Sequence, residues 1–252
     1  MPRRRRNWER QACYHITHRC HNREFRFRHE KYRRMYRRYL FEATRLFRFR
    51  VLTWIVTSNH VHVLATGTER GVPQISEALQ HVHGELAQHY NLERNCDGSF
   101  WSNRFHATRI QSGRHLARCM FYVDLNMVRA GVVSHPCEWD YGTWPELSGA
   151  RQRYRIVDRE VLLNRLEVGP WESFVSWYRQ TIDAMVADET RLRRQPHWST
   201  AVAVGDAEWL EQHACGLGMR RFEIREAMSP GPQEDDDVRT FFLDCQNQSK
   251  VP

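Results

Sequence analysis

Lysine is nearly absent from this 252-residue chain, which has only Lys31 and Lys250 among its 38 lysine and arginine residues. No apolar stretch approaches the roughly 20 residues of a membrane span, so we do not expect a membrane protein. The charged start is not followed by an apolar segment, and a secretory signal is therefore not expected. The seven cysteines include no Cys-x-x-Cys pair, which argues against structural zinc and a disulfide framework. These absences favour a reducing, cytoplasmic setting.

Positive charge is in excess and unevenly distributed. The formal net charge is +8, and residues 1–50 hold 17 basic residues against four acidic ones. From Gly205 onward the sequence has five basic and ten acidic residues, including the run Glu234-Asp235-Asp236-Asp237. A basic front half favours a polyanionic partner such as a nucleic acid. A genome-wide preference for arginine would explain the scarcity of lysine, but not this asymmetry.

The hydrophobic patterns predict an α+β fold. Runs rich in β-branched and aromatic residues predict strands at 13–18, 49–56, 60–66 and 108–111, and Thr57-Ser58-Asn59 predicts a turn between the second and third. Helical spacing predicts helices at 30–47, 73–90 and 112–129, the last with Ser112 as N-cap and Gly131 as its stop. The order β-α-β-β-α-β is the ferredoxin-like (RRM-like) pattern, an antiparallel sheet with helices on one face.

Composition divides the chain into three parts. Residues 1–12 form a basic N-terminal arm, and residues 13–144 contain the predicted sheet and its helices. Residues 145–252 form a predicted helical accessory region with an acidic C-terminal segment, because 151–195 shows helical spacing of apolar residues. No internal repeat is present, and the task of this last region cannot be inferred from its residues.

Two His-x-His steps stand out among 14 histidines. In a chain this rich in histidine, chance alone supplies roughly one such triplet, so context must separate them. His60-Val61-His62 lies in a predicted strand, where residues two apart share one face and both imidazoles can bind the same metal ion. His81-Val82-His83 lies in a predicted helix, where residues two apart point away from each other. Only the first pair is a candidate metal site.

Tyr122 and Asn126 are the second candidate pair. Residues four apart on a helix are neighbours on one face. A tyrosine is a potential nucleophile, and an amide oxygen is a potential metal ligand. A buried aromatic on an amphipathic helix is the alternative for Tyr122. Other tyrosines, such as Tyr14 and Tyr90, have no potential ligand at this spacing.

These motifs resemble a known family. Tyr14-His15-Ile16-Thr17, the strand 58–64, Phe100–His106 and the segment Tyr122–Val133 are similar to the REP-associated tyrosine transposases, single-tyrosine members of the HUH endonucleases within the IS200-like transposases. In that family the Tyr–x₃–Asn helix is followed by proline, where this chain has Met127. The resemblance covers about residues 13–144 and is weak beyond Trp144.

The resemblance implies a metal-dependent DNA endonuclease and strand transferase. Tyr122 would form a 5′-phosphotyrosine, and His60, His62 and Asn126 would bind Mg²⁺ or Mn²⁺. The expected substrate is single-stranded DNA bearing a palindromic hairpin, and the expected location is the nucleoid. A non-catalytic hairpin DNA- or RNA-binding regulator on the same fold is the alternative. A replication initiator or relaxase is disfavoured because those enzymes commonly place the tyrosine before the histidine motif. Monomer and homodimer both remain open.

Several arginines are candidate DNA contacts. Arg3 to Arg6 could contact phosphates or enter a minor groove as a flexible arm, or could be a solvated tail. Further phosphate contacts are expected on the helix face of 30–47 and near the proposed site. The full set is Arg3, Arg4, Arg5, Arg6, Arg33, Arg37, Arg104 and Arg109. Trp101, Phe105 and His106 could stack on an unpaired base or pack against the sheet.

Overall fold

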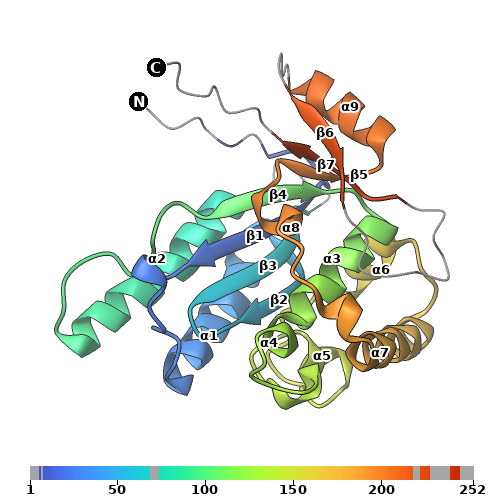
Figure 1. The fold of residues 1–252 in the computed structure, drawn as a ribbon. Coiled ribbons are helices and arrows are strands. Elements are labelled where there is room, and N and C mark those ends of the chain that lie inside the picture. Colours follow the sequence, from blue (N-terminus) through green and yellow to red (C-terminus); the bar gives the residue numbers. More distant parts are fainter. Residues whose placement is uncertain (1–5, 7, 69–73, 218–221, 228–238, 245–252) are drawn as a thin grey trace.

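A computed structural model describes residue 6 and residues 8–68, 74–217, 222–227 and 239–244. In this part of the chain, seven strands form one mixed sheet in the order β2-β3-β1-β4-β5-β7-β6 (Figure 1). The strands are β1 (Cys13–Arg19), β2 (Arg50–Val56), β3 (His60–Thr66), β4 (His106–Ile110), β5 (Ala203–Gly205), β6 (Glu223–Glu226) and β7 (Phe241–Asp244).

Helices cover both faces of the sheet. α1 (Glu30–Leu46) and α2 (Ile75–Arg94) pack together on one face, where His18 of β1 contacts His83 of α2. α3 (Arg114–Asp124) lies on the other face, where its Tyr122 lies beside His15 and His62. The remaining helices are α4 (Asn126–Arg129), α5 (Trp144–Leu147), α6 (Arg159–Leu166), α7 (Trp171–Ala187), α8 (His197–Thr200) and α9 (Ala207–Gly216). Short 3₁₀ turns are η1 (His21–Arg23), η2 (Pro136–Glu138) and η3 (Glu189–Leu192).

The turn between β2 and β3 fixes the register of the histidine strand. The Thr57 hydroxyl accepts hydrogen bonds from the backbone amides of Asn59 (3.3 Å) and His60 (3.1 Å), as expected for a threonine that closes a turn. The register then pairs Val56 with Val61 and Ile55 with His62. Because side chains alternate along a strand, Val61 and Val63 face α1 and α2, while His60 and His62 face α3.

The α+β class and the order β1-α1-β2-β3-α2-β4 agree with the sequence prediction. Three parts of the fold prediction were wrong. The helices are not confined to one face of the sheet, because α3 lies on the face opposite to α1 and α2. The sheet is not purely antiparallel, because β5 pairs with β4 in parallel. The C-terminal region is not purely helical, because it supplies β5, β6 and β7. These strands have only three or four residues and pair with distant segments, so they leave almost no periodic signal in the sequence.

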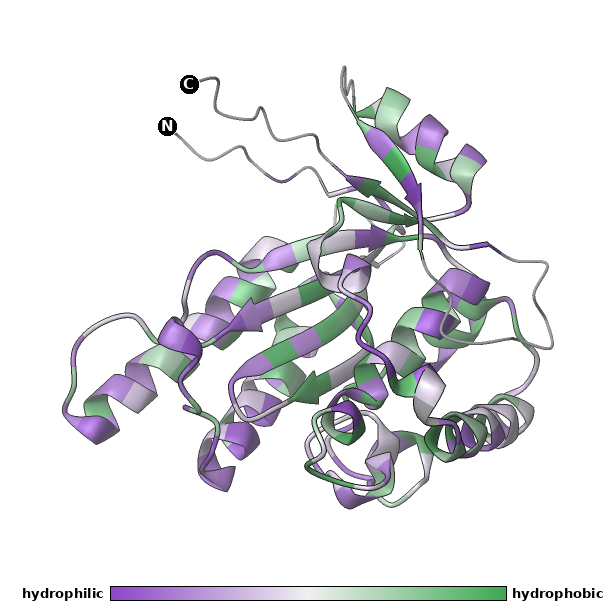
Figure 2. Cartoon of the chain, in the orientation of Figure 1, coloured by the Kyte–Doolittle hydropathy of each residue, from purple (hydrophilic) through white to green (hydrophobic). Residues whose placement is uncertain are grey.

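One hydrophobic core is shared by the first domain, residues 13–144, and the C-terminal region that follows it. Its buried residues run from Ala12 to Val204 and include Trp54 of β2, Tyr178 of α7 and Trp198 of α8. Figure 2 shows hydrophobic residues along the central strands and hydrophilic ones at the outer ends of α1 and α2. Within the described residues, no helix is long and apolar enough to cross a bilayer.

Candidate active site

His60 and His62 occupy one face of β3, as the strand pattern predicts. Their ring centroids lie 4.9 Å apart, and the Tyr122 ring lies 6.1 Å from that of His62. His62 and Tyr122 are buried, at 3% and 8% exposure, whereas His60 is half-buried. The structure therefore brings the histidine pair and the candidate nucleophile together, with His60 at the more open side of the group.

Asn126 also contacts His62, although the helix predicted to carry it is broken. Its Nδ2 lies 3.1 Å from Nε2 of His62. The predicted single helix 112–129 was wrong: α3 ends at Asp124, and α4 begins at Asn126. The guanidinium of Arg129 donates to the Tyr122 carbonyl oxygen (2.5 Å), the oxygen that the amide of Asn126 would bond in an unbroken helix.

His15 of β1 is a member of the cluster that the sequence prediction missed. Its Nε2 lies 2.9 Å from Nδ1 of His62, and its Nδ1 lies 2.7 Å from the backbone oxygen of Trp198 in α8. Alternation along β1 could have placed His15 and Thr17 on one face. Only the β1–β3 register, which pairs Thr17 with His62, shows that this is the same face as the histidine pair.

The three imidazoles are neutral near pH 7. Burial lowers the pKa of His15 to about 4 and that of His60 to about 4, and it holds the pKa of His62 well below its usual value. Nearby positive charge acts in the same direction: Arg19, Arg194 and Arg129 lower the pKa of His60. A neutral imidazole has a free lone pair, which is the form that binds metal ions.

The donor groups fit a divalent metal ion. His60 Nδ1 lies 2.7 Å from Oδ1 of Asn59, which can only accept, so Nδ1 carries the proton and Nε2 the lone pair. The Asn126 amide lies beside Nε2 of His62, and the centroids of the His60 and His62 rings are 4.9 Å apart. Among the described residues, no group of three or more His, Cys, Asp or Glu side chains could hold a metal. The expected ligand set therefore depends on Asn126.

Three arginines surround this cluster, and none was among the arginines predicted to bind DNA. Arg129 is half-buried, with its guanidinium carbon 4.1 Å from the centroid of the Tyr122 ring, and this burial lowers its pKa to about 10. Arg19 and Arg194 are exposed and interact electrostatically with His60 and with each other. At neutral pH all three are cationic, so the site is suited to bind an anion.

Those predicted DNA-binding arginines that the structure describes lie elsewhere or are engaged by protein groups. Arg109 was predicted to lie near the site, and this was wrong. Its side chain points to the opposite face of the sheet from His62 and donates to Glu9 (2.7 Å). Arg33 donates to the Phe27 carbonyl oxygen (2.6 Å), and Arg37 lies 5.9 Å from the Tyr141 ring centroid. Arg6 lies against the Phe105 ring, and Arg104 is exposed. Arg3, Arg4 and Arg5 lie outside the described residues.

The second His-x-His step lies in a helix, as predicted, and its two rings have separate surroundings. His83 is buried, with Nδ1 2.9 Å from Nδ1 of His18 and Nε2 3.3 Å from the Tyr36 hydroxyl. His81 instead lies near the rings of Phe47 and Tyr39. The two histidines therefore do not face a common ligand position.

The three residues considered for base stacking are packed into the protein. The Trp101 ring stacks on His18 at 4.2 Å, and Phe105 is 9% exposed. His106 is half-buried, with Nε2 3.1 Å from the Ala201 carbonyl oxygen. Their positions match the packing alternative.

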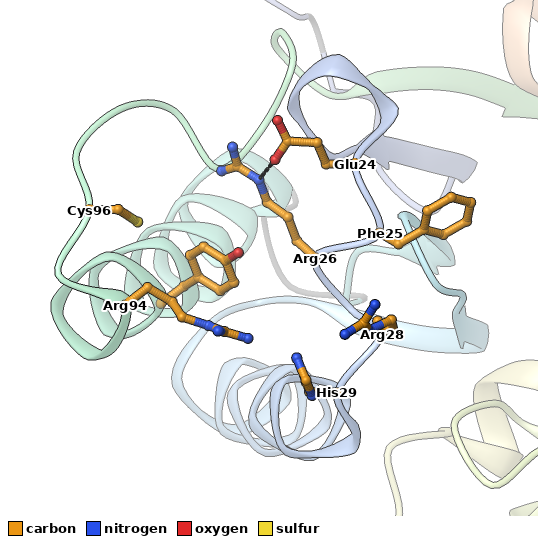
Figure 3. A pocket seen from close by; sticks show the side chains of 8 residues that line it. Glu24, Phe25, Arg26, Arg28, His29, Arg94 and Cys96 are labelled. Carbon is orange, nitrogen blue, oxygen red and sulfur yellow. Dashed lines mark hydrogen bonds and ion pairs between the residues drawn. The ribbon is translucent and has the colours of Figure 1, made fainter.

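A pocket of about 480 Å³ lies away from this cluster, between the start of α1 and the end of α2 (Figure 3). Its lining residues are Glu24, Phe25, Arg26, Arg28, His29, Tyr90, Arg94 and Cys96. Arg26 is paired with Glu24 at 2.9 Å. Because α1 and α2 cover the opposite face of the sheet from His62, the pocket is separate from the candidate site.

A family model accounts for the part of the chain that carries most of this site. Residues 9–126 match the model described as IS200-like transposase, a span that begins before β1 and ends at Asn126. Residues 9–126, a little under half of the chain, are thus similar to the IS200-like transposases.

A solved structure described as a REP-associated tyrosine transposase bound to a REP hairpin is also similar. Its identity to this chain is 22% and its TM-score 0.49, and the match covers 62% of this chain and 90% of that chain. No curated protein matches the chain.

Proposed function

We propose that this protein is an IS200-like transposase, a metal-dependent endonuclease and strand transferase that cleaves and rejoins hairpin-bearing single-stranded DNA through Tyr122. One observation carries the proposal: Tyr122 and Asn126 lie beside His62, a member of the neutral histidine pair on one face of the sheet. The hairpin substrate comes from the family resemblance, whereas the ferredoxin-like assignment comes from the predicted element order β-α-β-β-α-β. The strand order β2-β3-β1-β4 supports the latter.

His60, His62 and Asn126 would hold Mg²⁺ or Mn²⁺, with the two Nε2 atoms and the amide oxygen as ligands. Such an ion would act as a Lewis acid on a phosphate oxygen and would help to position the phosphodiester. Two imidazoles favour Mn²⁺ over the strictly oxygen-preferring Mg²⁺. The Asn126 amide can present either its nitrogen or its oxygen to this space by a half-turn of its last torsion.

The chemistry of cleavage conserves the energy of the broken bond. The Tyr122 oxygen attacks phosphorus, the bond from phosphorus to the 3′-oxygen breaks, and the departing strand end takes up a proton as a 3′-hydroxyl. A second 3′-hydroxyl then attacks the phosphotyrosine, restores a phosphodiester and returns the proton to the tyrosine. Arg129, Arg19 and Arg194 would stabilise the negative charge that spreads over the phosphate oxygens.

The test is covalent capture of DNA. Labelled single-stranded DNA with a flanking hairpin is incubated with the protein and Mn²⁺, and a denaturant-resistant adduct is expected. Tyr122→Phe removes the nucleophilic oxygen and should abolish the adduct. Tyr90→Phe, which changes a half-buried tyrosine on α2, should leave the adduct unchanged.

Two further variants separate the enzyme from the alternative regulator. His60→Ala or His62→Ala should abolish cleavage and largely preserve DNA binding, because they remove metal ligands but no phosphate-binding cation. Tight binding of the hairpin by the wild-type protein, without cleavage in Mn²⁺ or Mg²⁺, would instead support the non-catalytic regulator.

A further inference from the structure

We infer that His15 is a positioning residue that, together with the Trp198 carbonyl of α8, fixes His62 in the tautomer that leaves Nε2 free for the metal. This inference rests on the proposed function, because it assigns His62 Nε2 as a ligand. It also gives a task to the C-terminal region, which lies outside the residues matched by the family model.

The Trp198 carbonyl, His15 and His62 form a chain of hydrogen bonds, called the relay below. A backbone carbonyl oxygen can only accept, so His15 must donate its Nδ1 proton to Trp198, across 2.7 Å. A neutral His15 then has a lone pair on Nε2. Nε2 lies 2.9 Å from Nδ1 of His62, and a bond between two ring nitrogens needs one donor, so Nδ1 of His62 carries its proton.

The proton on Nδ1 of His62 determines the state of its other ring nitrogen, Nε2. With its single proton on Nδ1, neutral His62 has its lone pair on Nε2, the atom that faces Asn126 at 3.1 Å. A histidine whose other nitrogen is held by an outer partner is a common arrangement in metal sites, where the partner fixes the ring and its tautomer. In solution neutral imidazole favours the proton on Nε2, which would block the proposed ligand atom.

The C-terminal region holds the end of this relay in place. The Ala201 carbonyl oxygen, just beyond α8, accepts from the Thr108 hydroxyl of β4 at 2.9 Å. Trp198 is 1% exposed, and its indole nitrogen donates to Gln195 at 2.7 Å. The carbonyl that orients His15 is therefore fixed on the same sheet as the histidine pair.

Histidine nitrogen NMR of the full, metal-free chain tests the inference directly. In the wild type, His62, identified by the loss of its signals in His62→Asn, should carry its proton on Nδ1. His15→Phe keeps a ring but removes the acceptor, so His62 should shift toward the Nε2-protonated form. His15→Gln restores an acceptor oxygen near the position of Nε2 and should restore the wild-type tautomer.

Mn²⁺ titration of the same proteins gives a second readout. His15→Phe should weaken Mn²⁺ binding by about 10- to 100-fold, the usual effect of losing an outer partner of a metal-bound histidine. His15→Gln should recover most of that affinity. His89→Phe is the matched control: it makes the same substitution at an exposed position of α2, on the opposite face of the sheet from His62, and Mn²⁺ affinity should be unchanged.

The outcomes separate this inference from the proposed function. An Nε2-protonated His62 in the wild type, or a tautomer unchanged in His15→Phe, would overturn the relay even if the Tyr122 adduct forms. The expected tautomer and Mn²⁺ results without any adduct would instead support the relay and contradict the proposed reaction.

Discussion

Arg129 places a half-buried positive charge against the candidate nucleophile. Its guanidinium lies over the Tyr122 ring and also holds the carbonyl oxygen of that residue. The family motif around Tyr122 includes Arg129, but the sequence assigned it no role. The reason is geometric: the break between α3 and α4, which turns Arg129 back toward Tyr122, has no signal in the helical spacing of 112–129.

We predict that Arg129→Met slows DNA cleavage by about 10²- to 10³-fold, the range seen when one preorganised stabilising donor is removed from an active site. Mn²⁺ affinity should change little, because Arg129 is not a proposed ligand. Single-turnover cleavage and Mn²⁺ titration measure the two effects. Arg179→Met, which changes an exposed arginine bonded to the Ser148 carbonyl, is the control and should cleave normally. Equal losses in both variants would count against a role for Arg129.

Other parts of the site differ in how far sequence could predict them. Strand periodicity was enough to place His60 and His62 on one face. Asn126 does lie beside His62, but the single helix predicted to carry it was wrong, because the chain breaks between α3 and α4. His15 depends on the register between β1 and β3, and a shift of one residue would turn it to the other face. Trp198 is 183 residues from His15, so their contact follows from tertiary packing alone.

At the scale of elements, α2 shows a histidine whose charge is suppressed by packing. His83 faces His18 of β1 and Tyr36 of α1, and Trp101 packs beside it. Burial, reinforced by His18, holds the pKa of His83 well below its usual value of about 6.5. Between the folded and unfolded pKa values only the unfolded chain binds the proton, so the free energy of unfolding falls as the pH drops below about 6.5.

His83→Gln should therefore reduce the dependence of stability on pH. Glutamine keeps a donor and an acceptor but does not titrate, so the slope of the unfolding free energy between pH 6 and 5 should decrease by up to about 1.4 kcal/mol per pH unit, the value for one proton. Urea denaturation at several pH values measures this slope. His89→Gln, at an exposed position of α2, is the matched control. A slope in His83→Gln identical to wild type would contradict the prediction.

At the scale of the whole molecule, the C-terminal region is part of the structure that supports the site. Tyr178 of α7 donates to Oδ2 of Asp124 at 2.8 Å, at the end of the helix that carries Tyr122. Thr53 of β2 donates to the other carboxyl oxygen at 3.3 Å, so Asp124 ties three elements together. Residues 145–252 were predicted from the sequence to form an accessory region. The buried contact between Tyr178 and Asp124 joins residues 54 positions apart, so it could not be predicted from composition.

Tyr178→Phe tests whether the two regions unfold together. The substitution removes one donor from a buried carboxyl group, and we predict that it lowers the free energy of unfolding by about 1–3 kcal/mol. If the shared core makes the chain one cooperative unit, denaturation should remain a single transition when followed by near- and far-UV circular dichroism. Tyr154→Phe, at a side chain that is 68% exposed, should leave stability unchanged. A second transition in Tyr178→Phe, with the first domain still folded, would show that the C-terminal region is an independent unit. The Asp124 contact would then not be needed to hold α3, and with it Tyr122, in place.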